Sequence, residues 1–286
     1  MAKRRYALVS DASFAQRPGG ASRLVTRLAA AFPHEESELV FCTPGHLDRD
    51  CDGYALALTK WFSDEEMQFV IDRPYVRYEL DYWPNSEPQA RWRDPLNDAA
   101  RLVAFVSPLH KDVYLHKHPQ QFRASKPVLP CPLDPDEYTA PRLAAIDEPR
   151  NSVVWCGEWV WEKGPDIAGK WAQEHKTVVD FFSPTIHRQE QPFNSYSHLC
   201  GFMPECATDG SPQWYTHLAR YGKMVFFPRE PQCFAYSVLE AYLLGLEVEV
   251  SGRIGVESFD CNFDELVDRC SHSGRDFWDM ALNALP

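Results

Sequence analysis

Long apolar runs are missing from this 286-residue chain. No segment approaches the roughly 18 to 20 consecutive apolar residues that a membrane-spanning helix needs. The opening residues, MAKRRYALVSD, also lack the apolar core and the cleavage site of a secretory signal peptide. We therefore expect a protein without a membrane span that resides in the cytoplasm, or in the host cytoplasm if the protein is viral.

Cysteine pairs are missing as well. The chain has nine cysteines, an odd number, and no two of them form a Cys-x-x-Cys pair. This count and spacing argue against both a disulfide framework and a zinc site, so we expect buried free thiols. His110, His116 and His118 do not all fall on one helical face, and no metal is expected from them.

Positive charge is scarce. The 29 lysines and arginines stand against 41 aspartates and glutamates, which gives a net charge of −12 and a pI near 5.3. Such a balance opposes a general attraction to nucleic-acid phosphates or anionic lipid. A local basic patch remains open, built from Lys3, Arg4 and Arg5 or from Arg91 and Arg93.

What the chain does have is an alternation of strand-like and helix-like segments. Hydrophobic residues make up 44% of it and aromatic residues 13%, enough for packed cores. Strands are expected at residues 6–9, 38–42, 103–106, 152–156 and 177–182, and helical patterns follow most of them. This order predicts an α/β protein with a mainly parallel sheet in each half.

A proline-containing stretch, RLAAIDEPRN, separates the two halves and is typical of a linker. We therefore expect one domain at residues 1–145 and another at 146–286. Helices are expected at residues 263–270 and 276–285. The terminal helix is expected to pack back on the first domain.

The stretch at residues 223–245, KMVFFPREPQCFAYSVLEAYLLG, combines a strand, a loop and the start of a helix. Pro228 stops the apolar run, and Gly245 closes the helix that follows the polar loop. The first amides of a helix have no partner within it and attract anions. We therefore expect the amides of Tyr236 and Ser237 to bind an anionic ligand.

The residues of this stretch resemble the donor-binding motif of family 4 glycosyltransferases of the GT-B fold, in which two glutamates are separated by seven residues. Glu240 matches the second glutamate, whereas Gln232 stands at the first, and Cys233 and Ala235 replace two glycines. The resemblance implies that Glu240 accepts hydrogen bonds from the ribose hydroxyls. It also implies that Gln232 contacts a hydroxyl of the donor sugar.

Two further segments are similar to motifs of the same family, in the same order. CGEWVWEKGPD resembles a Gly-Arg…Glu-Lys-Gly segment, which implies that Gly157 and Lys163 lie at the donor diphosphate, although Glu158 replaces the arginine. Residues 201–204, GFMP, resemble the Gly-Phe-x-Pro turn whose backbone binds the nucleotide base. The resemblance implies that Met203 lies at the base.

The first half offers two candidate groups. Gly19 and Gly20 resemble the Gly-Gly loop near the start of these transferases, and glycines let the backbone approach a ligand closely. Glu79 and Asp81 lie near the carboxyl end of an expected strand at residues 73–82, where open α/β sheets bind ligands. We interpret them as orienting an acceptor hydroxyl, with surface carboxylates beside Arg73 and Arg77 as the alternative.

Together the resemblance implies a glycosyltransferase, a hexosyl- or pentosyltransferase, with two Rossmann-like domains and a donor cleft between them. The donor would be a UDP-sugar or a GDP-sugar, transferred with retention and without a metal. The short chain is typical of viral enzymes, and the most specific acceptor is a hydroxymethylated pyrimidine in DNA. The alternatives are a small metabolite or glycan precursor as acceptor, or an inactive nucleotide-sugar-binding protein.

Overall fold

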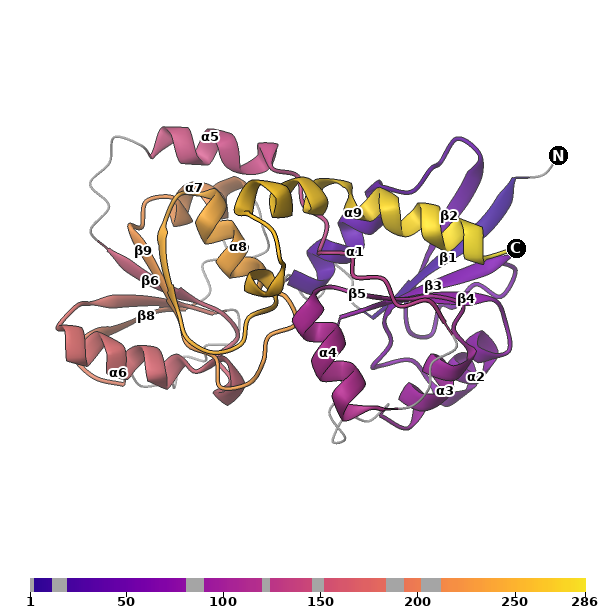
Figure 1. The fold of residues 1–286 in the computed structure, drawn as a ribbon, viewed down its shortest axis with the longest axis horizontal. Helices are drawn as coiled ribbons and strands as arrows, with labels where there is room; N and C mark the ends of the chain where they lie inside the picture. Colours follow the sequence, from indigo (N-terminus) through magenta and orange to yellow (C-terminus); the bar gives the residue numbers. More distant parts are fainter. Residues whose placement is uncertain are drawn as a thin grey trace. The chain divides into compact units, whose positions relative to one another are not determined.

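A computed structural model describes residues 3–11, 20–80, 90–119, 124–145, 152–183, 193–201 and 212–286. They form two compact units, each with its own five-stranded sheet (Figure 1). Unit 1 contains the first strand together with Ala21–Leu133 and Ser258–Pro286, and unit 2 contains Asp134–Glu257. The change from one unit to the other therefore comes before residue 145, the end of the first domain expected from the sequence.

The sheet of unit 1 has the order β2-β1-β3-β4-β5, and every neighbouring pair is parallel. Its strands are β1 (Arg4–Ser10), β2 (Ser37–Cys42), β3 (Gly53–Leu58), β4 (Tyr75–Glu79) and β5 (Val103–Phe105). The connecting helices are α1 (Gly20–Ala30), α2 (Asp64–Ile71), the short turn η1 (Ala90–Trp92), α3 (Arg93–Ala99) and α4 (Pro108–Lys117). Strands β4 and β5 are buried along their whole length, as expected where helices cover both faces of a parallel sheet.

Unit 1 is completed by α9 (Phe263–Ala284), a single helix of 22 residues that follows unit 2 in the sequence. It begins with a capping box between Asn262 and Glu265. Gly274 lies mid-helix where α9 meets α1, and a Cβ there would approach Ala31 Cβ to 2.9 Å. Trp278 donates from Nε1 to the Leu28 carbonyl at 2.7 Å. The expectation of two separate helices was therefore wrong, because the residues between them pack against α1.

Unit 2 repeats the architecture with the strand order β10-β9-β6-β7-β8, again all parallel. Its strands are β6 (Val153–Cys156), β7 (Val179–Phe182), β8 (Ser197–Gly201), β9 (Lys223–Phe226) and β10 (Glu247–Val250). Its helices are α5 (Asp136–Ala144), α6 (Pro165–His175), α7 (Pro212–Leu218) and α8 (Tyr236–Leu243), with short turns η2 (Trp161–Lys163) and η3 (Gly255–Ser258). Trp155 and Phe181 are fully buried in its core.

The prediction of an α/β protein with two Rossmann-like domains, each built on a parallel sheet, is confirmed. Sequence reasoning did not identify β3, whose residues GYALAL form a short apolar run without a helix-like or strand-like period around it. No helix in the described ranges is both long and apolar enough to cross a bilayer. The eight cysteines in those ranges are free thiols, and four of them are buried.

Candidate functional site

The loops that follow β6 and β9 lie against each other at the carboxyl edge of the unit 2 sheet. The two strands are neighbours, so their ends meet at the same edge, where open α/β sheets bind ligands. The Arg229 amide donates to the Glu162 carbonyl at 3.0 Å, and its guanidinium donates to the Trp161 carbonyl at 2.8 Å. Arg229 also forms an ion pair with Asp166 on α6. These contacts fix one loop on the other.

The hydrogen bond from Arg229 holds the pKa of Asp166 below its ordinary value, and the charge of Arg229 acts in the same direction. Asp166 in turn raises the pKa of Arg229. Both side chains reach solvent, so this ion pair contributes little to stability. Its effect is to orient Arg229, whose contacts with the two carbonyls then hold the η2 turn in place.

Gly164 connects η2 to α6 and has the left-handed conformation, with φ at +65°. A Cβ at this position would lie 2.0 Å from the Phe227 carbonyl oxygen. Only glycine therefore allows both the turn and the close approach of the β9 loop. This explains the glycine of the Glu-Lys-Gly segment, because it sets the position of the preceding Lys163.

Lys163 and Gln232, two predicted site residues, are in direct contact. The ammonium of Lys163 donates a hydrogen bond to Oε1 of Gln232, and Gln232 Nε2 donates to the Glu230 carbonyl at 2.8 Å. The Gln232 amide donates to the Arg253 carbonyl at 2.9 Å, and its own carbonyl accepts from Gly255 at 2.9 Å. Gln232 is buried, while Lys163 is half-buried. The site thus presents a cation whose partner is a neutral amide.

Helix α8 begins just after this contact, at Tyr236. Its N-cap residue is Ala235, which has a left-handed φ of 69°, the conformation that glycine adopts most easily. The amides of Val238 and Leu239 both donate to the Ala235 carbonyl, so the helix starts without a side-chain cap. Tyr236 is buried and Ser237 is half-buried at this start. The replaced family glycine therefore keeps its backbone conformation.

Glu240 is buried, with 1% of its surface exposed. Its Oε1 lies 3.4 Å from the hydroxyls of Tyr138 on α5 and Tyr215 on α7, and these two hydroxyls are 3.0 Å apart. The tyrosine rings also pack together, with centroids 4.3 Å apart. A carboxylate needs such donors when it is buried. The contact of Glu240 with ribose hydroxyls stays a prediction. The two tyrosine hydroxyls position the Glu240 carboxylate.

In unit 1, Glu79 lies at the end of β4 with only 2% of its surface exposed. It forms an ion pair with Arg77, and its Oε1 accepts from the Leu80 amide at 3.1 Å. Arg77 also donates to Asn97 Oδ1, and Asn97 donates to the Tyr114 hydroxyl at 2.9 Å. The interpretation of Glu79 as a surface carboxylate is therefore wrong, because it belongs to a buried polar network. Its role toward an acceptor stays a prediction.

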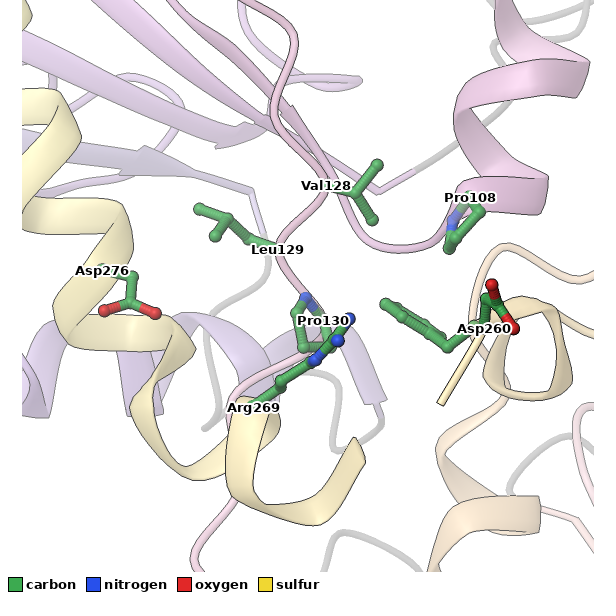
Figure 2. A pocket seen from close by; sticks show the side chains of 8 residues that line it. Pro108, Val128, Leu129, Pro130, Asp260, Arg269 and Asp276 are labelled. Carbon is green, nitrogen blue, oxygen red and sulfur yellow. The ribbon is translucent and has the colours of Figure 1, made fainter. Parts of the chain in front are cut away.

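A cavity of about 400 Å³ lies in unit 1 near the end of β5 (Figure 2). The Leu129 amide donates to the Phe105 carbonyl at 2.9 Å, and the Tyr78 hydroxyl donates to the Leu129 and Pro130 carbonyls. These bonds place Leu129 and Pro130 at the carboxyl edge of the sheet. The lining residues are Pro108, Val128, Leu129, Pro130, Phe259, Asp260, Arg269 and Asp276. Its size is that of ordinary ligand sites.

The structure describes some of the remaining predicted site residues and not others. Gly19, Asp81 and Met203 lie outside the described residues. Gly20 is the first residue of α1. Gly157 follows β6, and a Cβ there would lie 3.2 Å from the Trp155 ring, while the neighbouring Glu158 is exposed. Among the predicted site residues that the structure describes, Lys163 and Gln232 are in direct contact.

Sequence reasoning missed four residues that support these sites. Arg229 and Asp166 lie within the segments that carry the motifs but were assigned no role there, and their pairing depends on two loops meeting at the sheet edge. Tyr138 and Tyr215 come from helices α5 and α7, far from Glu240 in the sequence. Only the three-dimensional fold brings such residues together. A buried tyrosine is nevertheless a general signal, because its hydroxyl usually has a hydrogen-bonding partner.

No protein-family model matches the chain, and no curated protein matches it in sequence. Solved structures do match its fold. The chain is similar to HepE of Anabaena, solved with UDP and glucose, with a TM-score of 0.64 and 12% identity, over 98% of this chain and 96% of that one. Sucrose-phosphate synthase from Thermosynechococcus elongatus matches with a TM-score of 0.66 and 11% identity, over 98% and 95%.

An alpha-glucosyltransferase solved with UDP-glucose and DNA containing an abasic site matches with a TM-score of 0.58 and 9% identity, over 98% of this chain and 93% of that one. At such low identity these similarities define the fold, and they cover almost the whole chain. The chain has the GT-B fold, the two-unit architecture of these glycosyltransferases.

Proposed function

We propose that the protein transfers a sugar from a nucleotide-sugar donor, most specifically a UDP-sugar, to a hydroxyl group of an acceptor. The observation that carries this proposal is the contact of Lys163 with Gln232. Gln232 lies on the loop that leads into the N-terminus of α8. A lysine cation and helix amides suit a diphosphate. HepE, which has the same fold, was solved with UDP-glucose.

We assign the donor to unit 2, in the C-terminal half, and the acceptor to unit 1. In this assignment Lys163 binds the diphosphate together with the helix amides, Gln232 binds a sugar hydroxyl, and Glu240 binds the ribose. The other residues that we assign to the donor are Gly19, Gly20, Gly157, Met203, Tyr236 and Ser237. Transfer proceeds with retention and without a metal, the departing diphosphate accepting the acceptor's proton. Catalysis then rests on positioning and charge stabilisation.

We place the acceptor at the carboxyl edge of the unit 1 sheet, where the cavity lies and where β4 ends at Glu79. Asp81 follows two residues later. The most specific acceptor is a hydroxymethylated pyrimidine in DNA, supported by the fold shared with the alpha-glucosyltransferase solved with DNA containing an HMU base. The net charge of −12 favours the second acceptor class, a small metabolite or a glycan precursor.

A second candidate function is nucleotide-sugar binding without transfer. One observation favours it: the exposed Glu158 stands where a second cation is expected. A carboxylate repels the diphosphate, so the donor would have one cation to neutralise its developing charge. Such a pocket would hold a donor but stabilise the departing diphosphate less.

Incubation with UDP- and GDP-sugars tests both candidates. Mass spectrometry follows oligonucleotides carrying hydroxymethyluracil or hydroxymethylcytosine, together with small hydroxyl acceptors, while chromatography follows release of free nucleotide diphosphate. Transfer is expected with a UDP-sugar, at a rate that added Mg²⁺ or Mn²⁺ leaves unchanged, and the product's anomeric configuration tests retention. Nucleotide binding with no transfer or hydrolysis across the panel supports the second candidate. Absence of nucleotide binding overturns both.

A further inference from the structure

Three side chains of the types that bind metal ions lie together at the edge of the unit 2 sheet. Asp180 lies on β7, and His198 and Cys200 lie on β8, the edge strand. One carboxylate oxygen, one ring nitrogen and the thiol sulfur all lie within 4.8 Å of one another. Among the residues that the structure describes, no other group of three His, Cys, Asp or Glu residues is this close.

The strand register explains why Asp180 and His198 meet. Asp180 on β7 pairs directly with His198 on β8. Cys200 lies two residues after His198 at a register shift, where Phe181 pairs with Leu199 and Phe182 pairs with Gly201. Directly opposed residues and their diagonal neighbours on one face of a sheet lie within contact distance. The sheet therefore pairs Asp180 with His198, and the distance from the Cys200 sulfur to His198 places the thiol beside them.

The distances suit a small tetrahedral ion. Cys200 Sγ lies 3.6 Å from His198 Nδ1. Zinc bonds of about 2.3 Å to sulfur and about 2.0 Å to nitrogen, at a tetrahedral angle, separate those two atoms by roughly 3.5 Å. Asp180 Oδ1 lies 2.8 Å from the same ring nitrogen, and a zinc ion requires these two atoms to separate by roughly half an ångström, which side-chain rotation supplies.

A further residue orients the carboxylate. The Tyr221 hydroxyl donates to Asp180 Oδ2 at 2.8 Å, which leaves Oδ1 directed toward His198. Protein metal sites use outer hydrogen bonds of this kind to fix their ligands. His198 is 68% exposed at its side chain, whereas Asp180 is 23% exposed. An ion can therefore enter from solvent, and a water molecule can complete its coordination.

We propose that Asp180, His198 and Cys200 form a zinc-binding site in unit 2, with water as the fourth ligand. A thiol, an imidazole and a carboxylate together form the donor set of a borderline-soft cation, which excludes magnesium and calcium as preferred ions. The site links β8 to β7 at the sheet edge. The sequence predicted no metal. A His-x-Cys pair and a distant aspartate match no common zinc spacing, so they gave no signal.

The test uses the full chain, freed of metal with a chelator and then equilibrated with Zn²⁺ alone. About one zinc per chain is expected to remain after dialysis, measured by plasma mass spectrometry, with Mg²⁺ unable to compete. Replacement by Co²⁺ is expected to produce a thiolate-to-cobalt charge-transfer band in the near ultraviolet. Cys200→Ser should remove that band, and His198→Gln should weaken Zn²⁺ binding by about tenfold or more.

The control is Cys261→Ser, which removes a half-buried cysteine of unit 1 and should preserve both signals. Because the His198 side chain is exposed, His198→Gln keeps the fold and decides the case if Cys200→Ser does not fold. The proposal is overturned if wild-type protein retains no zinc. It is also overturned if His198→Gln binds zinc as tightly as the wild type and the Cys261→Ser control do, because the ion then lies elsewhere.

Discussion

Lys163 and Gln232 are 69 residues apart in the sequence, yet the ammonium of Lys163 donates a hydrogen bond to the side-chain oxygen of Gln232. The motif that this loop resembles has a glutamate at the position of Gln232. A glutamate would neutralise the lysine, whereas the neutral amide orients it and leaves its charge available to an anion. The pair therefore favours a pocket that attracts a diphosphate through one oriented cation.

Replacing Gln232 by glutamate tests that reasoning. The new carboxylate would form an ion pair with Lys163, so a diphosphate would have to compete with a fixed anion. We expect UDP to bind about fivefold to tenfold more weakly, which corresponds to about 1 kcal/mol. Isothermal titration calorimetry measures the change, with Glu230→Gln as a control on the same loop. Unchanged or tighter UDP binding by Gln232→Glu would place the diphosphate away from Lys163.

Gly164 is predicted to be indispensable for the loop that carries Lys163. Gly164→Ala would place a Cβ 2.0 Å from the Phe227 carbonyl in a left-handed conformation, so we expect a loss of about 3 kcal/mol or more in the free energy of unfolding. Gly45→Ala is the matched control, since Gly45 has a φ of +78° but no atom within 4 Å of the added Cβ. It should lose only about 1 kcal/mol. Equal losses in urea unfolding would show that the contact with Phe227 has no effect.

Glu79→Gln separates a structural role from an acceptor-binding role. The substitution would leave Arg77 charged and buried without its carboxylate partner, so we expect a loss of about 3 to 5 kcal/mol in the free energy of unfolding. The double variant Arg77→Met/Glu79→Gln should recover part of that loss, and Glu65→Gln at an exposed ion pair should change little. Full stability combined with lost transfer would instead make Glu79 an acceptor-binding residue.

The Asp166–Arg229 ion pair predicts a small pH dependence of stability. The folded-state pKa of Asp166 lies below its ordinary value, so its stabilisation is complete above the unfolded pKa, near 4, and is lost as pH falls through the folded pKa. Asp166→Asn should therefore lower the urea midpoint slightly at pH 7. The difference from wild type should disappear as the pH falls well below 4. A difference independent of pH would assign the effect to something other than this charge.

Sequence reasoning went furthest where a feature depends on neighbouring residues. The strand, the loop and the helix start at residues 223–245 are local patterns, and the structure contains them as β9, a loop and α8. The Glu-Lys-Gly segment likewise contains the glycine that its left-handed turn requires. The parallel sheet of each unit followed from the alternation of apolar strands with amphipathic helices.

The remaining features depend on contacts between distant segments. The continuity of α9 follows from the packing of Gly274 and Trp278 on α1, which no local pattern reveals. The burial of Glu79 follows from Arg77 and Asn97, and the partners of Glu240 come from two other helices. Polar groups of this kind are placed by the fold as a whole, so their environment could not be read from the motif alone.

The affinity of Lys163→Ala for UDP tests the central claim most directly. Removal of a charged hydrogen-bond donor to the diphosphate should weaken UDP binding by about tenfold to a hundredfold, measured by isothermal titration calorimetry on protein whose circular dichroism matches the wild type. Lys170→Ala, at an exposed position of α6, should bind UDP as the wild type does. If Lys163→Ala also binds UDP with wild-type affinity, the donor site does not lie where we have placed it.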